Sequence, residues 1–274
     1  IAEKLDIAYV TIPIEKIVGV NEQVLNAVDA DGTGKKLSEF NLENLQAKIR
    51  GTSILSNLAA MYGALFTNNG NKLETALGYA TLYGDVGGAI APIGDLTKAE
   101  IFELAEYINK EIFHDEVIPG ILLPDELYRF GEEQIQPSAE LKNNQVDPMK
   151  FGYHCALVNA MTDFMRKTTE DIMGWYLDGT LEENLGVTHE LIQRYGIDEP
   201  SEFIRDLEWF DEAMQRNVFK RVQGPPIIVT SKSAFGYDIR ESILPHENTL
   251  THERLKEKVL ALRRYETREL EVAA

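Results

Sequence analysis

The stretch NNGNKLETALGYATLYGDVGGAIAPIGDLTK, residues 68–98, is the most informative part of the sequence. It follows a helical pattern of apolar residues over 42–62 and a short apolar segment, 64–66, which we expect to be a buried strand. It ends where an amphipathic helix is predicted over 98–109. A helix, a strand, a glycine-rich loop and a second helix in this order are typical of an α/β fold with a parallel sheet, and loops at strand ends bind ligands in such folds.

The side chains within this stretch suit a planar ligand that carries phosphate. Glu74 offers a carboxylate, Tyr79 and Tyr83 can cover an aromatic ring, and Lys98 opens a helix, where anions are favoured. The glycines allow the backbone to approach a ligand closely. The same residues are equally compatible with ordinary turns and a solvated carboxylate, so residue types alone do not decide between the two interpretations.

The remainder of the chain is expected to form two parts. Residues 1–150 are predicted to hold the α/β core, with a strand within 9–14, and residues 151–274 are predicted to be mainly helical. Segment 114–152 is expected to be an extended excursion from the core. Four further helices are predicted, over 153–177, 181–195, 201–221 and 251–270.

Composition excludes several classes of protein. The 274 residues include 27 Lys and Arg, 45 Asp and Glu, and one cysteine, which gives a net charge of −18. The acidic balance disfavours nucleic acid and anionic lipid as partners. One cysteine cannot form an internal disulfide, and no apolar run approaches the roughly 18 residues of a membrane helix. We therefore expect a cytoplasmic protein with a sizeable core.

Three local features are assigned structural roles. The acidic turn at 29–34 matches the start of a calcium loop, but Phe40 lies where a bidentate carboxylate is needed. Cys155 lies on an apolar helix, and its neighbour His154 points elsewhere, which favours a core cysteine over a nucleophile. Neither glycine-rich stretch matches the dinucleotide-binding or P-loop pattern, which disfavours hydride transfer and P-loop kinases.

Four ordered motifs in this chain resemble those of the NAD synthetases. The resemblance extends over about residues 8–240, and a set of ordered motifs is far more specific than any one of them. The motifs are ENLQAKIRG at 43–51, the stretch at 68–98, PSAEL at 137–141, and FKRVQGPPI at 219–227 followed by SAFG at 233–236.

The resemblance implies a fold and a set of binding residues. The fold is the Rossmann-like adenine nucleotide alpha-hydrolase, or ATP pyrophosphatase, type, a parallel sheet flanked by helices, here with a helical C-terminal extension that carries a substrate-closing loop. The residues implied for ATP are Asn69, Lys98 and Ser138. Those implied for deamido-NAD are Lys48, Glu74, Tyr79, Ala80, Thr81, Leu82 and Lys220. Among them, Tyr79 to Leu82 are implied to form the wall for the nicotinate ring, and Glu74 is also implied to bind Mg²⁺. Two positions depart from the family pattern, because Asn69 replaces a usual threonine and Lys48 an arginine that could bind phosphate through two hydrogen bonds.

The resemblance also implies a reaction. NAD synthetases activate the poorly electrophilic carboxylate of deamido-NAD with ATP as an acyl-adenylate, and ammonia then displaces AMP to form NAD. Mg²⁺ and lysines suit a site where pyrophosphate charge develops. The implied partners are ATP, deamido-NAD, ammonia from a glutaminase domain, and further copies of the chain in a homo-oligomer.

One family element does not occur in the sequence. The Ser-Gly-Gly-x-Asp-Ser loop that holds the ATP pyrophosphate is missing from the 274 residues, and so is a glutaminase domain. We therefore expect the chain to be the C-terminal part of a longer, glutamine-dependent NAD synthetase and to be inactive by itself. Two alternatives remain at this point: another ligase of the ATP pyrophosphatase type, or a non-catalytic module that binds nucleotide or a subunit.

Overall fold

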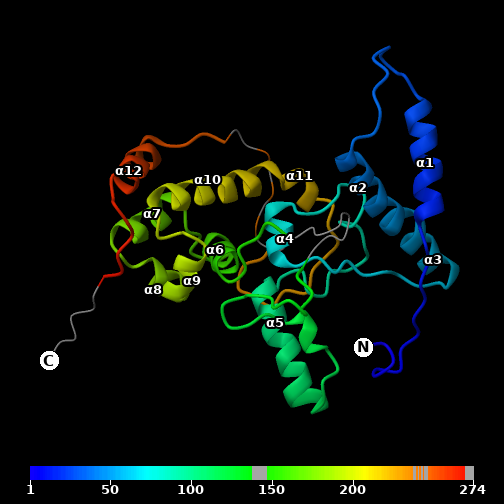
Figure 1. Cartoon of the computed structure of the whole chain (residues 1–274), viewed down its shortest axis with the longest axis horizontal. Coiled ribbons are helices and arrows are strands. Elements are labelled where there is room, and N and C mark those ends of the chain that lie inside the picture. The colour runs from blue at the N-terminus through cyan, green and yellow to red at the C-terminus, as the bar shows by residue number, and fades with distance from the viewer. Residues whose placement is uncertain (138–146, 237–238, 240, 242, 244–245, 269–274) are drawn as a thin grey trace.

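The computed structural model describes residues 1–137, 147–236, 239, 241, 243 and 246–268. Its N-terminal helices lie at one side of the molecule and its C-terminal helices at the other, with α4 (Lys72–Leu77) between them (Figure 1). Because α4 follows directly on the polar turn of the 68–98 stretch, the most informative part of the sequence lies at the centre of the fold.

The N-terminal side is built from α1 (Glu15–Ala27) and a long, continuous helical segment. That segment runs through α2 (Glu39–Lys48), a π-helical stretch η1 (Ile49–Leu55) and α3 (Ser56–Met61), which confirms the helix predicted over 42–62. A capping box starts it, because the side chain of Ser38 accepts a hydrogen bond from the backbone of Asn41 and the Asn41 side chain bonds back.

Gly51 allows the η1 stretch to pack against the glycine-rich loop. A Cβ atom at this position would lie 2.6 Å from the carbonyl oxygen of Gly84. Any other residue would therefore push the helix away from the loop that follows α4. This close approach connects the N-terminal helices to the centre of the molecule.

The expected parallel sheet is not confirmed in the described residues. Short segments of three stretches run side by side in the same direction: Ala89 donates to Phe66, Asn68 donates to Ile90, Ala91 donates to Pro226, and Ile228 donates to Ala91. Of these contacts, the one between Ala91 and Ile227 forms an isolated parallel bridge, and the described residues contain no extended strand.

The segments expected as strands lack the surroundings that a parallel sheet needs. Tyr9 and Val10 are 79% and 68% exposed, and Leu65 in the segment 64–66 is 82% exposed. Strands of a parallel sheet are covered on both faces and paired along their edges. The predictions of a strand within 9–14 and of a buried strand at 64–66 are therefore wrong for this structure.

The C-terminal side is helical, as predicted, with shorter pieces than the sequence suggested. The predicted helix over 153–177 is interrupted between Thr162 and Thr169, and the one over 251–270 ends at Leu260. Threonine N-caps at Thr168, Thr188 and Thr249 start three of the helices. The helices are α6 (Tyr153–Thr162), α7 (Thr169–Leu177), α8 (Leu181–Leu185), α9 (His189–Arg194), α10 (Pro200–Arg216), α11 (Val218–Arg221) and α12 (Leu250–Leu260).

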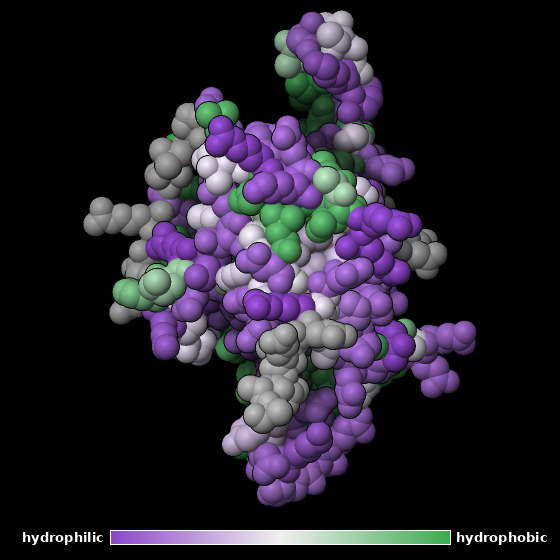
Figure 2. Space-filling view, turned by 90° about the vertical axis from the view of Figure 1, so that its left-hand side faces the viewer, coloured by the Kyte–Doolittle hydropathy of each residue, from purple (hydrophilic) through white to green (hydrophobic). Residues whose placement is uncertain are grey.

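One apolar core joins these helices to α4. Tyr176 and Phe203 stack at its centre with ring centroids 4.0 Å apart, and Leu73 and Ala76 of α4 belong to the same cluster. Figure 2 shows that the side of the molecule formed by the C-terminal helices is mostly hydrophilic, with an apolar patch near the middle of this face. Cys155 is buried in this core, as expected. The division of the chain near residue 150 stays a prediction.

A buried histidine of the helical part is paired with charged side chains. His154 is fully buried, and its Nε2 lies 2.9 Å from Asp206 Oδ2, while its Nδ1 accepts a hydrogen bond from the backbone of Lys150. The side chain of Lys150 also bonds Asp206. Burial lowers the pKa of His154, although Asp206 opposes the shift. These contacts hold α6 against α10.

The remaining helix, α5 (Lys98–Tyr107), continues into the π-helical stretch η2 (Ile108–Phe113), which matches the helix predicted over 98–109. It projects from the lower side of the molecule in Figure 1. Thr97 starts it with a capping box to Glu100. Among the described helices, none has the length and apolar character needed to cross a bilayer.

The stacked pair at the centre of the core gives a first prediction. We expect Phe203→Ala to lower the free energy of unfolding by about 3–5 kcal/mol, since it leaves a cavity where a fully buried ring stood. Urea denaturation followed by circular dichroism measures this change. The matched control is Phe164→Ala, because Phe164 is 76% exposed. Equal losses for the two variants would show that the core is not centred on Phe203.

Candidate functional site

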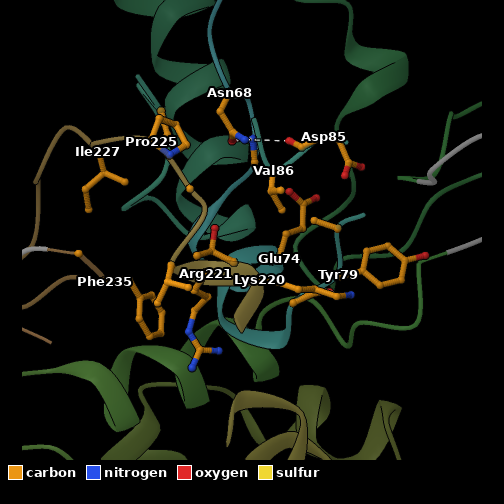
Figure 3. Close-up of a pocket in the computed structure, with 18 of the residues that line it drawn as sticks. Asn68, Glu74, Tyr79, Asp85, Val86, Lys220, Arg221, Pro225, Ile227 and Phe235 are labelled. Carbon is orange, nitrogen blue, oxygen red and sulfur yellow. Dashed lines mark hydrogen bonds between the residues drawn. The ribbon is translucent and has the colours of Figure 1, made fainter. Parts of the chain in front are cut away.

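A cavity of about 580 Å³ lies beside α4 at the centre of the molecule. This volume is in the range of small-molecule sites, about 300–1,000 Å³. Its walls combine polar residues from the 68–98 stretch with apolar residues from the segment after α11 (Figure 3). The polar and charged residues that line it are Asn68, Asn69, Glu74, Thr75, Tyr79, Asp85, Asp147, Lys220, Arg221 and Glu241, and the larger apolar ones are Val86, Val222, Pro225, Ile227, Phe235 and Ile239.

The first turn of α4 positions Glu74. The backbone N–H of Glu74 donates to Asn71 Oδ1 at 3.0 Å, and the N–H of Asn71 donates to Glu74 Oε2 at 3.0 Å. This reciprocal capping box satisfies two backbone donors and fixes the carboxylate at the wall of the cavity. The loop before it is held by Asn68, whose side chain donates to Asp85 O at 2.8 Å (Figure 3).

Gly78 ends α4 and lets the next element approach. It adopts a left-handed conformation with φ of 63°, and a Cβ atom there would overlap the side chain of Asn217. Glycine adopts this backbone conformation without steric cost. The chain can therefore turn sharply toward Tyr79 and Ala80, which line the cavity.

Three side chains from the end of α10 and from α11 bind the carbonyl oxygens at the C-terminus of α4. Asn217 donates to Leu77 O at 2.8 Å, Lys220 to Gly78 O at 2.7 Å and Arg221 to Ala76 O at 2.7 Å. Cations are favoured at a helix C-terminus, where carbonyl oxygens lack helical partners. The sequence NVFKR at 217–221 thus fixes one wall of the cavity to α4.

Arg221 also binds the part of the cavity wall that carries Glu241 and Phe235. It binds Glu241 through two nitrogens, at 2.6 and 3.1 Å, and its guanidinium lies 5.0 Å from the ring centroid of Phe235. Paired bonds of this kind between arginine and a carboxylate are strong and directional. The apolar side of the cavity is therefore held in place by one buried arginine.

A buried ion pair anchors the remaining wall. Lys72 Nζ lies 3.4 Å from Asp95 Oδ1, and both side chains are almost completely buried. Asp95 also accepts hydrogen bonds from the backbone N–H groups of Thr230 and Ser231, at 2.8 and 2.7 Å. Burial raises the pKa of Asp95, but the bonds from Ser231 and Thr230 together with Lys72 outweigh it and leave a lowered pKa. This pair joins α4 to the segment that carries Ile227.

The carboxylates and lysines of the site influence one another. Burial raises the pKa of Glu74, and the charges of Asp147 and Asp85 add to the rise, whereas Asn71 and Lys98 oppose it. Burial lowers the pKa of Lys220, against the opposing charge of Asp85. A half-buried lysine with a lowered pKa is incompletely solvated, so an anionic group of a ligand would be a favourable partner for it.

The structure brings together about half of the residues predicted for binding. Asn69, Glu74, Tyr79, Ala80 and Lys220 all line the cavity. Lys98 does not line it, but its charge opposes the rise that burial causes in the pKa values of Glu74 and Asp147.

The other predicted residues are placed elsewhere. Lys48 is exposed near the end of α2, and neither it nor Leu82 lines the cavity. Thr81 is buried, and its hydroxyl donates to Asn44 Oδ1 at 2.9 Å. Ser138 lies outside the described residues.

Several cavity residues were not predicted. Asp85 lies in the motif at 68–98, Phe235 in the motif at 233–236 and Arg221 directly after Lys220 in the motif at 219–227. Their positions in these motifs could have indicated a role in the cavity. Asp147 had no such signal, because it follows a polar stretch with no regular pattern. Its place in the cavity depends on the path of the chain between α5 and α6.

Glu74 suits a metal site that is shared with a ligand. Among the residues that the structure describes, no three or more Asp, Glu, His or Cys side chains gather closely enough to hold a metal ion. Mg²⁺ is commonly held by one or two carboxylates, with substrate phosphates and water completing its shell. The site therefore fits Mg²⁺ bound by Glu74 together with phosphate oxygens, and it does not fit a metal held by protein groups alone.

Comparison with known proteins connects this geometry to one family. Residues 1–198 match the family model described as NAD synthase. The chain is 30% identical to the glutamine-dependent NAD(+) synthetase of Synechocystis sp. over 240 residues, which are 86% of this chain and 35% of the relative. It is also 30% identical to the enzyme of the same name from Thermotoga maritima over 247 residues, which cover 89% of this chain and 35% of that one.

A solved structure shares the fold. The crystal structure of a glutamine-dependent NAD(+) synthetase from Cytophaga hutchinsonii superposes with a TM-score of 0.62 at 16% sequence identity, covering 94% of this chain and 37% of that one. The chain thus spans about a third of the length of the curated relatives that it matches. The fold similarity holds although the described residues form bridges in place of extended strands.

The buried ion pair beneath the cavity gives a second prediction. We expect Lys72→Met to lower the free energy of unfolding by about 3–5 kcal/mol, because it leaves the buried Asp95 without its counter-charge. Thermal unfolding followed by circular dichroism measures the loss. Lys110→Met is the control, since Lys110 forms an exposed pair with Glu106 and such pairs contribute little. A stable Lys72→Met variant would show that the pair does not anchor the wall.

Proposed function

Because this chain belongs to the NAD synthase family, we propose that it supplies the synthetase site of a ligase that converts deamido-NAD to NAD with ATP and ammonia. The observation that carries the proposal is the cavity itself. It brings Glu74, Tyr79, Ala80, Lys220 and Asn69 together in a space large enough for part of a dinucleotide.

The two sides of the cavity suit the two kinds of group in the proposed substrates. Tyr79, from the 68–98 stretch, offers a ring against which a nicotinate ring can pack. Lys220 offers a half-buried ammonium group for phosphate, and Lys98 adds positive charge near Glu74. Apolar contacts from Ile227 and Phe235 complete the wall that faces these polar groups.

The proposed reaction has two steps. A carboxylate oxygen of deamido-NAD attacks the α-phosphorus of ATP, and pyrophosphate leaves with the electrons of the broken P–O bond. Ammonia then attacks the acyl carbon, the C–O bond to AMP breaks, AMP leaves with that electron pair, and the nitrogen loses a proton. Mg²⁺, held by Glu74 and phosphate oxygens, would neutralise negative charge that develops on the pyrophosphate.

The residues of this chain contribute mainly by binding and orientation. The capping box holds Glu74 in one position, and the contacts of α11 with α4 hold Lys220 beside Gly78. To bind a ligand phosphate, Lys220 must give up its hydrogen bond to the Gly78 carbonyl oxygen. This exchange is favourable because a hydrogen bond between two charged groups is stronger than one to a neutral carbonyl. The apolar wall excludes water from the acyl carbon, where hydrolysis would compete with ammonia.

Partners are proposed on the same basis. Ammonia would come from a glutaminase domain, because the relatives are glutamine-dependent NAD(+) synthetases. A homo-oligomer is supported by α1, which has no buried residue and exposes Val20, Val24 and Leu25. Such a row of exposed apolar side chains is favourable when another chain covers it.

Binding of the proposed substrate by the 274-residue chain gives a third prediction. We expect calorimetric titration with deamido-NAD to show saturable binding, and Lys220→Met to weaken it about tenfold through loss of a charge-assisted contact to phosphate. We also expect no NAD to form with ATP, Mg²⁺ and ammonium, since the sequence contains no Ser-Gly-Gly-x-Asp-Ser loop.

Two controls make this experiment decisive. Lys110→Met removes an exposed lysine outside the cavity and should leave the affinity unchanged. Circular dichroism of Lys220→Met separates lost binding from lost folding, because Lys220 also contacts the end of α4. Absence of any binding by the folded wild-type chain would refute the proposed function, and turnover by the chain alone would refute its expected inactivity.

A further inference from the structure

Asp147 is a buried carboxyl group at the wall of the cavity. It is 8% exposed, and its Oδ1 atom receives no hydrogen bond from the residues that the structure describes. Tyr79 lines the same cavity, and the backbone N–H of Asp147 donates to Pro137 O at 3.1 Å. The backbone of Asp147 is thus fixed at the cavity wall, while one oxygen of its carboxyl group is left without a donor.

An unsatisfied buried acceptor is costly to keep. An oxygen left without a partner keeps the full cost of its desolvation, which is larger for a charged group. Buried polar atoms of this kind are rare in folded proteins, and a bound ligand is one of the ways in which they are satisfied. The position of Asp147 at the cavity wall therefore favours a ligand atom that donates a hydrogen bond there.

The surrounding charges narrow the kind of donor. Burial raises the pKa of Asp147, the charge of Lys98 opposes this rise, and Glu74 lines the same cavity with a second carboxyl group. Two carboxyl groups beside one lysine leave an excess of acceptors over cations. At Asp147 Oδ1 itself, which can only accept a hydrogen bond when ionised, a neutral or cationic N–H group is a favourable partner, whereas a carboxylate or phosphate oxygen is not.

We propose that Asp147 Oδ1 accepts a hydrogen bond from the nitrogen that the reaction adds, bound first as ammonium, which releases one proton to solvent to become the attacking ammonia, and present afterwards as the carboxamide. This inference rests on the proposed function, which places the nicotinate ring at Tyr79, and Tyr79 lines the same cavity as Asp147. Asp147 is then a specificity-determining residue that favours the amide over the carboxylate at the same position of the dinucleotide.

The consequence is a difference between two ligands that differ in one group. NAD carries a carboxamide whose N–H can reach Asp147, and deamido-NAD carries a carboxylate there that offers no donor. A site built to bond an N–H group discriminates strongly against an analogue that lacks it. Ammonium restores the missing donor when deamido-NAD occupies the cavity.

The experiment measures the affinities of the wild-type chain and of Asp147→Asn for both dinucleotides by calorimetry. The asparagine can donate to a carboxylate as well as accept from an amide. We therefore expect the ratio of the Kd for deamido-NAD to the Kd for NAD to fall at least fivefold. Asp163→Asn removes the same charge from an exposed position outside the cavity and should leave the ratio unchanged.

A second measurement on the wild-type chain does not depend on the folding of a variant. We expect deamido-NAD to bind at least threefold more tightly in ammonium chloride than in potassium chloride of equal concentration, because potassium has the same charge and no hydrogen to donate. Equal affinities in the two salts, or an unchanged ratio in a folded Asp147→Asn variant, would overturn the inference while leaving the proposed function intact. Failure of the wild-type chain to bind either dinucleotide would overturn the proposed function itself.

Discussion

The buried ion pair between Lys72 and Asp95 is the contact on which the arrangement of the cavity depends. It places a positive and a negative charge 3.4 Å apart where almost no solvent reaches them. A buried charge without a partner is strongly unfavourable, so each residue requires the other in the folded state. Since Asp95 also binds the backbone of Thr230 and Ser231, the pair fixes the start of α4 and the distant segment beyond residue 226 in one position.

The two ends of α4 carry the rest of the site. At its N-terminus the capping box with Asn71 orients Glu74, and at its C-terminus the side chains of Asn217, Lys220 and Arg221 bind its last carbonyl groups. A helix of six residues gains little stability from its own hydrogen bonds. Its position therefore comes from these terminal contacts and from Leu73 and Ala76 in the core. The same contacts that stabilise α4 also bring the cavity walls together.

The helices could be predicted from the sequence because their signals are local. Ser38, Thr97 and Thr168 each start a helix by binding the backbone three residues later, and apolar periodicity marks the faces that become buried. The predicted strands are absent from the described residues. Apolar segments such as 64–66 are compatible with a strand, but a strand forms only where neighbouring segments pair with it along its length.

The candidate site was predictable to the extent that its residues lie in recognisable motifs. Glu74, Tyr79 and Lys220 stand in such motifs and line the cavity together. Lys48 also stands in a motif, yet it is exposed on α2, because motif position does not determine which face of a helix a residue occupies. Asp147 shows the opposite case, since only the three-dimensional path of the chain brings it to Tyr79.

Hydrogen–deuterium exchange with and without deamido-NAD tests the central claim most directly, that the cavity beside α4 is the dinucleotide site. The account predicts slower exchange in two separate segments, 70–80 and 218–236, because a ligand in the cavity contacts both of its walls. The exposed helix α1 should show no change and serves as the internal reference. Protection confined to other segments, or no protection at ligand saturation, would contradict the account.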